Sequence, residues 1–174
     1  MSALASAIGC EDAGVLSLLR AASGDGLVVY DGSDAPARLT DAGRLTAQQL
    51  INDAVSDAGA LDTAYEADYI PLNERVKHLC AEWQSRRGTS RASRALTALQ
   101  RLHFQALLVF RDMAAWYPRI AVYERRLTSA VERFASGDER YVTSPLVDSY
   151  HSAWFECHAE LMLALNRRPD REGS

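Results

Sequence analysis

The sequence has no long hydrophobic run and few cysteines, and both absences narrow what the protein can be. The chain has 174 residues, and none of its apolar runs approaches the length of roughly 18 residues that a membrane span requires. The first residues, MSALASAIGCEDAG, carry no basic n-region and reach acidic residues at once, unlike a secretory signal. The three cysteines, Cys10, Cys80 and Cys157, are odd in number and widely spaced. We therefore expect reduced thiols in a cytoplasmic protein without a membrane segment.

The sequence also lacks the short motifs of common enzyme classes. It has no Gly-x-Ser-x-Gly turn, no phosphate-binding glycine loop before a lysine, no His-Glu-x-x-His and no dinucleotide fingerprint. The glycine-rich stretch GDGLVVYDG, residues 24–32, begins before its strand-like segment, whereas a dinucleotide loop follows a strand. We therefore expect a non-enzymatic protein without a cofactor, although residues scattered along the chain can still converge into a catalytic site.

What the sequence does contain is enough apolar material for a core, combined with an uneven charge. Hydrophobic residues make up 48% of the chain, which is typical of a folded domain. The net charge is −4, but residues 1–70 hold eleven acidic residues and three arginines. Residues 71–140 hold thirteen basic and seven acidic residues. This contrast indicates two parts with opposite electrostatic character.

The first third has the order helix, turn, helix, strand, turn, strand, helix. The expected elements are an Ala-rich helix at 2–8, a helix at 12–23, strands Leu27–Tyr30 and Ala37–Leu39, and a helix that Thr40 caps. The turn between the strands is rich in Asp, Gly and Pro, as hairpin turns commonly are. This order predicts a small module with a two-stranded wing over residues 1–58.

From residue 59 onward the pattern is helical throughout. Prolines and capping residues mark the expected boundaries. Pro71 kinks or begins a helix, and Ser90 caps a helix that runs to Ala115. Pro118 begins a helix that ends at Gly137, and Ser144-Pro145 begins one that runs through Leu165 to a stop at Asn166. We therefore predict a helical bundle at 59–168 and a disordered tail at 169–174.

The segment LASAIGCEDAGVLSLLRAASGDGLVVYDGSDAPARLTDAGR, residues 4–44, resembles the DNA-reading half of MarR-type winged-helix regulators. In that pattern a helix-turn-helix leads to Gly-Leu-Val, a wing, and Leu-Thr-x-x-Gly-Arg at the start of a long helix. The stretches YIPLNERVKHLCAEWQ and VDSYHSAWFECHAELMLAL are similar to the helical C-terminal region of an actinobacterial group of such proteins. That group is associated with phosphoenolpyruvate-utilising enzymes similar to pyruvate phosphate dikinase.

The resemblance implies a mainly α protein: a truncated winged helix-turn-helix with a two-stranded wing, followed by an α-helical bundle. MarR-type domains have a further helix before this motif, and we expect it to be missing here. The exposed apolar surface that this leaves would be covered in a homodimer. The candidate DNA-contacting residues are Ser17, Arg20, Arg38 and Arg44. Ser17 and Arg20 lie on one helical face and could touch bases or phosphates, but Arg20 could also be a solvated surface arginine.

Charge argues against strong DNA binding by this module. DNA affinity rests largely on lysine and arginine that neutralise phosphates. The expected recognition helix offers only Arg20, and the wing offers Arg38 against Asp31 and Asp34. Two hypotheses therefore stay open. The protein is a transcriptional regulator that binds DNA weakly or as a dimer, or it is an accessory module for a protein partner, such as a phosphotransfer enzyme, that has lost DNA binding.

A third hypothesis is a helical ligand-binding protein with a pocket inside the bundle. The candidate pocket residues are His78, Trp83, Tyr150, His151, Trp154 and His158. Buried Trp and Tyr more often fill a core and find one hydrogen-bond partner, so a core cluster is the competing interpretation. The two histidines of the last helix, seven residues apart, lie too far from each other along the axis to share one metal.

Two further patterns have both a metal-binding and an ordinary interpretation. Asp148 and His151, at i and i+3, could supply two ligands, but a second carboxylate–histidine pair is missing. His78 lies four residues from both Glu74 and Glu82, a spacing that also suits surface pairing. We expect surface pairing for His78, hydrogen bonds within the bundle for His151 and His158, and no metal.

The densest basic run is RRGTSRASR, residues 86–94, followed by Arg101. These arginines could bind the phosphates of a nucleic acid or of a phosphorylated ligand. They could also be solvated, or dock the acidic N-terminal third across a domain or dimer contact.

Overall fold

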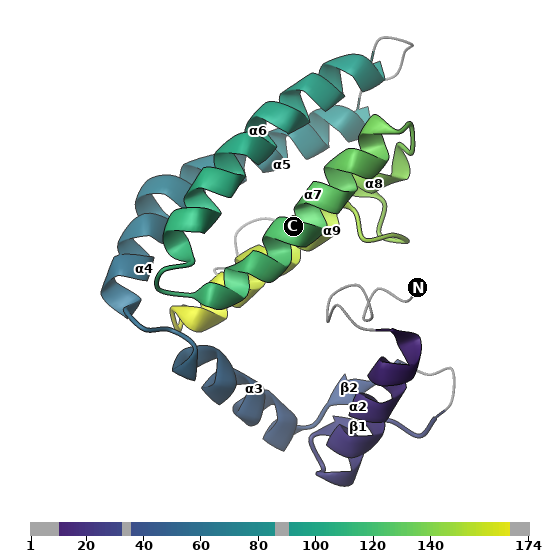
Figure 1. Cartoon of the computed structure of the whole chain (residues 1–174), viewed down its shortest axis with the longest axis vertical. Coiled ribbons are helices and arrows are strands. Elements are labelled where there is room, and N and C mark those ends of the chain that lie inside the picture. Colours follow the sequence, from purple (N-terminus) through teal and green to yellow (C-terminus); the bar gives the residue numbers. More distant parts are fainter. Residues whose placement is uncertain (1–10, 33–35, 86–90, 168–174) are drawn as a thin grey trace. The chain divides into compact units, whose positions relative to one another are not determined.

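The computed structural model describes residues 11–32, 36–85 and 91–167. The chain divides into two compact units, Met1–Ala54 and Val55–Ser174 (Figure 1). Helices dominate, and the described strands form one two-stranded antiparallel sheet. The expected mainly helical fold with one small sheet is therefore confirmed. Among the described helices, none has the length and apolar character needed to cross a membrane.

The N-terminal unit consists of two helices joined by a short hairpin. Its elements are α2 (Asp12–Gly24), β1 (Val28–Val29), β2 (Arg38–Leu39) and α3 (Asp41–Asp53). Val28 pairs with Leu39 and Val29 with Arg38. Helix α2 ends where Gly26 adopts a positive φ of 69°, a conformation that costs glycine little. The Leu27 amide then donates to the Ala22 carbonyl and directs the chain into β1.

The segment Leu39–Arg44 forms the joint that closes this unit. The Thr40 hydroxyl accepts from the Gly43 amide at 2.9 Å, which caps α3 as the sequence predicts, and donates to the Gly26 carbonyl at 2.7 Å. A Cβ at Gly43 would lie 1.9 Å from the Leu27 carbonyl oxygen, so only glycine allows the helix to approach the hairpin this closely. The Leu-Thr-x-x-Gly-Arg motif therefore has a structural explanation in this chain.

The C-terminal unit is a bundle in which each long helix packs against its neighbours (Figure 1). Its elements are α4 (Ala58–Ala64), the π-helical turn η1 (Tyr65–Tyr69), α5 (Ile70–Ser85), α6 (Arg91–Met113), the 3-10 turn η2 (Pro118–Ile120), α7 (Ala121–Ala135), α8 (Arg140–Thr143) and α9 (Tyr150–Ala164). Helix α6 packs against α5 and α7, and α7 packs against α9. The interior is filled by large apolar side chains, among them Leu61, Tyr69, Leu99, Phe110, Leu127 and Leu161.

The π-helical turn lies directly before Pro71. Proline has no amide hydrogen, so it cannot take part in the regular i to i−4 ladder of an α-helix. The Ile70 amide instead reaches back five residues to the Tyr65 carbonyl, and the chain continues as α5 with Pro71 in its first turn. Of the two expected outcomes, a helix start describes this position better than a kink. The wider turn leaves both Tyr65 and Tyr69 buried.

Most of the expected helix ends agree with the structure, but one start is wrong. Gly137 and Asn166 have positive φ values of 101° and 51° just past α7 and α9, as stop residues commonly do. The last helix begins at Tyr150 and not at Ser144-Pro145. Its cap is Ser149, whose hydroxyl accepts from the Ser152 amide.

The reason for the late start is the position of Asp148, which precedes that cap. Its carboxylate is bound by Arg126 of α7, so residues 145–148 form turns that bring Asp148 to this arginine. Other expectations lie outside the described residues: the helix at 2–8, Cys10, the Ser90 cap and the disordered tail at 169–174.

Replacing Leu161 by Ala should lower the free energy of unfolding by about 2–5 kcal/mol, because this side chain is 1% exposed and its removal leaves a cavity. Leu163 on the same helix is 43% exposed, and Leu163→Ala should change stability by no more than about 0.5 kcal/mol. Urea unfolding followed by circular dichroism measures both. Equal losses for the two variants would contradict this placement of α9.

Candidate functional site

The four residues expected at a DNA surface all lie in the N-terminal unit but differ in their surroundings. Ser17 and Arg20 are exposed one turn apart on α2, and Arg38 is exposed on β2. Arg44 instead donates to the Leu39 carbonyl at 3.0 Å and forms an ion pair with Asp41. Its guanidinium thus belongs to the joint between β2 and α3, which leaves less of its charge for a phosphate.

The surface of this unit is acidic and partly apolar. Residues 1–54 hold seven acidic residues and three arginines. Of the large hydrophobic residues described in the unit, Val15 alone is buried. Those classed as exposed are Leu16, Leu18, Val29, Leu39, Leu45 and Leu50. These exposed apolar side chains are spread over α2, the hairpin and α3.

Aromatic rings form a layer in the middle of the bundle. Trp154 of α9 stacks on Tyr69 at a centroid distance of 5.2 Å, and its indole N–H donates to the Asn73 side chain at 2.8 Å. His158 stacks on the same tyrosine at 5.8 Å and on Tyr65 at 6.0 Å. These rings are packed against one another, which agrees with the interpretation of a core cluster.

The six candidate pocket residues do not meet at one place. Tyr150, Trp154 and His158 lie along the inner face of α9. Trp83 packs edge-on against Phe134 at 5.3 Å. The remaining two, His78 and His151, are exposed on the surface.

The surface histidine His78 lies 3.8 Å from Glu82, as surface pairing predicts. The other nearby carboxylate, Glu74, binds Lys77 at 3.1 Å. In the described ranges, no group of three or more His, Cys, Asp or Glu side chains could hold a metal ion. Cys80 and Cys157 are buried thiols, and burial raises the pKa of Cys80 to about 11, so it stays protonated and unreactive near neutral pH.

Two carboxylate networks join α7 to α9, and the sequence pattern did not reveal them. Glu160 accepts hydrogen bonds from the Tyr117 hydroxyl, from the Tyr123 hydroxyl at 2.8 Å and from Arg119 at 3.0 Å. Although burial raises its pKa, these donors together hold it below the usual range. The partners are thirty-seven or more residues away in sequence, so only the packing of the helices brings them together.

The second network surrounds Arg126, whose side chain is almost fully buried. Its guanidinium binds Asp148 and Glu156, each at 2.7 Å. Asp148 therefore has a cation as its partner and is not positioned as a metal ligand beside His151. Paired and hydrogen-bonded in this way, the buried arginine fixes the approach of the 145–148 turns to α7.

Two histidines in the bundle have a lowered pKa. Burial lowers the pKa of His158, with nearby Lys77 acting in the same direction and Glu74 opposing it. Burial also lowers the pKa of His103, against the opposing effect of Glu132. Among the described residues, the buried Nδ1 atoms of both rings and the buried hydroxyl of Tyr150 have no hydrogen-bond partner.

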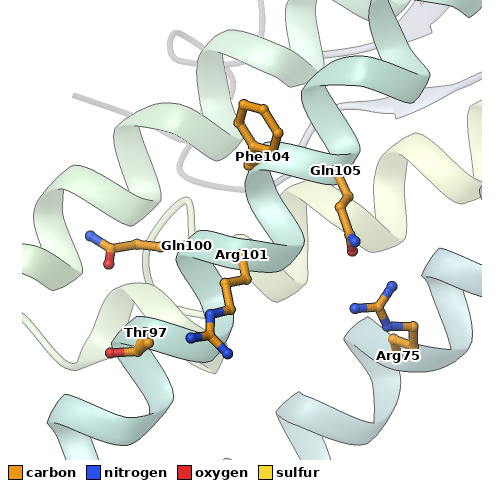
Figure 2. Close-up of a pocket in the computed structure, with 6 residues that line it drawn as sticks. All are labelled: Arg75, Thr97, Gln100, Arg101, Phe104 and Gln105. Carbon is orange, nitrogen blue, oxygen red and sulfur yellow. The ribbon is translucent and has the colours of Figure 1, made fainter.

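A shallow depression lies between α5 and α6 (Figure 2). It has a volume of about 530 Å³ and is lined by Arg75, Thr97, Gln100, Arg101, Phe104 and Gln105. Arg101 was expected to act with the basic run at 86–94, of which residues 86–90 lie outside the described ranges. The structure adds Arg75, from a different helix, to its surroundings. No lining residue is a carboxylate.

Comparison with known proteins gives no relative: no family model, curated protein or solved structure matches this chain.

The stability of the bundle should fall as the pH is lowered from 7.5 to 5.5. His103 and His158 have folded pKa values below the ordinary 6.5, so the unfolded chain takes up protons that the folded chain resists. Well above pH 6.5 both states are neutral at these positions and the loss disappears. His158→Gln should make the fall smaller, whereas His151→Gln on the exposed face of α9 should leave it unchanged. Urea unfolding at the two pH values measures this, and an equal effect of both variants would contradict it.

Proposed function

We propose that the protein is a non-enzymatic regulator of the winged-helix type, whose N-terminal unit contacts DNA through α2 and the hairpin. The observation that supports this most directly is the joint at Thr40, Gly43 and Arg44. It joins a helix, a two-stranded antiparallel hairpin and a second helix in the order of a reading helix, a wing and a linking helix.

In this proposal the side chains differ in their roles. Ser17 and Arg20 face solvent on the same side of α2, at the spacing with which a helix presents two side chains to a groove. Arg38 is exposed on β2 and would contact the DNA backbone as a wing residue does. Arg44 serves the fold, since its guanidinium is shared between Asp41 and the Leu39 carbonyl.

Few phosphate contacts are available to one protomer, so a homodimer is part of the proposal. The exposed leucines of α2 and α3 supply apolar surface for a symmetric contact. Two protomers would double the contacts that Arg20 and Arg38 make. The acidic balance of the unit keeps affinity low even then.

A second candidate function is an accessory module for a protein partner, such as a phosphotransfer enzyme. The observation that favours it is the combination of exposed apolar side chains with seven acidic residues and three arginines in the N-terminal unit. Such a surface complements a protein with a basic, apolar face better than it complements DNA.

DNA binding by Arg20 and Arg38 should have a shallow salt dependence. With only these contacts in a dimer, log affinity against log salt should have a slope of about −2 to −4, at ~0.9 per phosphate. Arg20→Ala and Arg38→Ala should each reduce the slope by about one unit or more. Fluorescence anisotropy on a labelled duplex between ~50 and ~200 mM salt measures this.

Arg101→Ala and Arg94→Ala remove arginines of the other unit and serve as controls, which should leave the slope unchanged. If the controls carry the slope, the bundle is the nucleic-acid face. If no binding is seen at ~50 mM salt, the regulator proposal fails and the accessory module takes its place.

The dimer should depend on the exposed leucines of α3. Leu45→Ser combined with Leu50→Ser should raise the dissociation constant of the dimer, because both side chains are largely exposed in the single chain and would lose apolar contacts. Sedimentation velocity over a concentration series measures the shift towards monomer. A single chain that is already monomeric at micromolar concentration would refute this part of the proposal.

A further inference from the structure

Helix α6 has a buried apolar face and, opposite it, an exposed face with an apolar centre. The buried face carries Leu99, Leu102, Ala106, Phe110 and Met113. On the opposite side an exposed stripe carries Thr97, Arg101, Phe104, Leu108 and Arg111, here called the α6 stripe. Its members alternate in steps of four and three residues, which is the spacing of a coiled-coil seam. The stripe spans about 21 Å at ~1.5 Å per residue.

The centre of the α6 stripe is apolar and exposed. Phe104 is 63% exposed and Leu108 is 40% exposed, one helical turn apart. Exposed pairs of this size on a helix surface form an anchor site for another helix, since each can enter a gap between side chains of a partner. Figure 2 shows Phe104 extending away from α6 and Gln105 extending towards the side of Arg75, while Arg101 extends along its own helix towards Thr97.

The charged side chains that line the depression beside this centre have one sign. Arg101 lies on the stripe and Arg75 lies across the depression on α5. Neither arginine has an ion-pair partner among the described residues, and the depression contains no carboxylate. Arg111 closes the other end of the stripe, although Asp112 binds it at 3.1 Å. The stripe thus has apolar side chains at its middle and unneutralised arginine at its N-terminal part.

Three occupants can be compared on this basis. A second copy of α6 would place arginine against arginine, since Arg101 meets Arg111 in an antiparallel pair and Arg101 in a parallel one. Nucleic acid would use the arginines but would leave Phe104 and Leu108 without an apolar partner. A helix with leucines along one side and carboxylates beside them satisfies both features at once.

We propose that the α6 stripe binds an acidic amphipathic helix of a partner protein, with Phe104 and Leu108 as the apolar anchors and Arg75 and Arg101 as the carboxylate-binding residues. This site is separate from the DNA-contacting residues of the N-terminal unit and does not depend on them. A regulator with such a site would be able to receive a protein signal on its bundle.

The probe is a synthetic helical peptide with leucines in alternating steps of three and four residues and glutamates on both flanks. A matched peptide carries lysine at every glutamate position. The acidic peptide should bind the full chain at least tenfold more tightly than the lysine peptide, because only the former complements Arg75 and Arg101. Isothermal titration calorimetry measures the affinities, and amide shifts in two-dimensional NMR should map to α6 and α5.

Variants distinguish binding at this site from nonspecific binding to exposed apolar side chains. Phe104→Ala should weaken the acidic peptide by about tenfold or more, and Arg101→Glu should weaken it while improving binding of the lysine peptide. Phe155→Ala removes a phenyl ring that is 66% exposed on α9 and should have no effect. Arg20→Ala, which reduces DNA binding in the proposed function, should leave peptide affinity unchanged.

Absence of acidic-peptide binding would overturn the proposal. So would equal affinity for the two peptides, or amide shifts confined to other helices. A loss of affinity in Phe155→Ala as large as that in Phe104→Ala would also overturn it. Because Phe104 is exposed, its replacement should not prevent folding, and unchanged far-ultraviolet circular dichroism verifies this for each variant.

Discussion

The bundle depends on how α9 places Trp154 against the π-helical turn before α5. The Trp154 side chain makes two interactions there. Its indole ring stacks on Tyr69, and its N–H donates a hydrogen bond to the buried side chain of Asn73. If the turn before Pro71 were a regular α-helix, Tyr65 and Tyr69 would point in other directions around the axis. The aromatic layer would then lose the ring on which both Trp154 and His158 stack. A single local departure from helical geometry therefore sets the register of α9 against the rest of the bundle.

The polar networks between α7 and α9 also fix the position of α9 in the bundle. Glu160 is surrounded by two tyrosine hydroxyls and an arginine, and Arg126 is held between two carboxylates. Buried charges are costly unless every partner is in place, so these networks tolerate only one alignment of the two helices. They explain why Asp148 lies outside α9 and why the helix begins at Tyr150 with Ser149 as its cap.

The N-terminal unit shows how a motif can be structural and still bear on function. Thr40 and Gly43 are required by the joint itself, since one ties the hairpin to α3 and the other allows their close approach. Their presence is therefore explained by the fold of this unit, whereas in the proposed function the exposed residues of α2 and β2 make the contacts with DNA. In the bundle, the two faces of α6 separate in the same way: one side builds the core, and the other presents an apolar centre beside free arginines.

Local chemistry in the sequence was sufficient for the mainly helical class, the hairpin, the Thr40 cap and the stops at Gly137 and Asn166, because each follows from a few neighbouring residues. The start of α9 was missed because Arg126, twenty-two residues away, decides where Asp148 lies. The sequence also did not predict that His78, Trp83 and His151 lie apart from His158, because helix periodicity does not specify which helix faces pack together. The pairing of Arg75 with Arg101 around one depression also needed the packing of α5 on α6. Side chains from distant parts of the chain share a site only when tertiary packing brings their helices together.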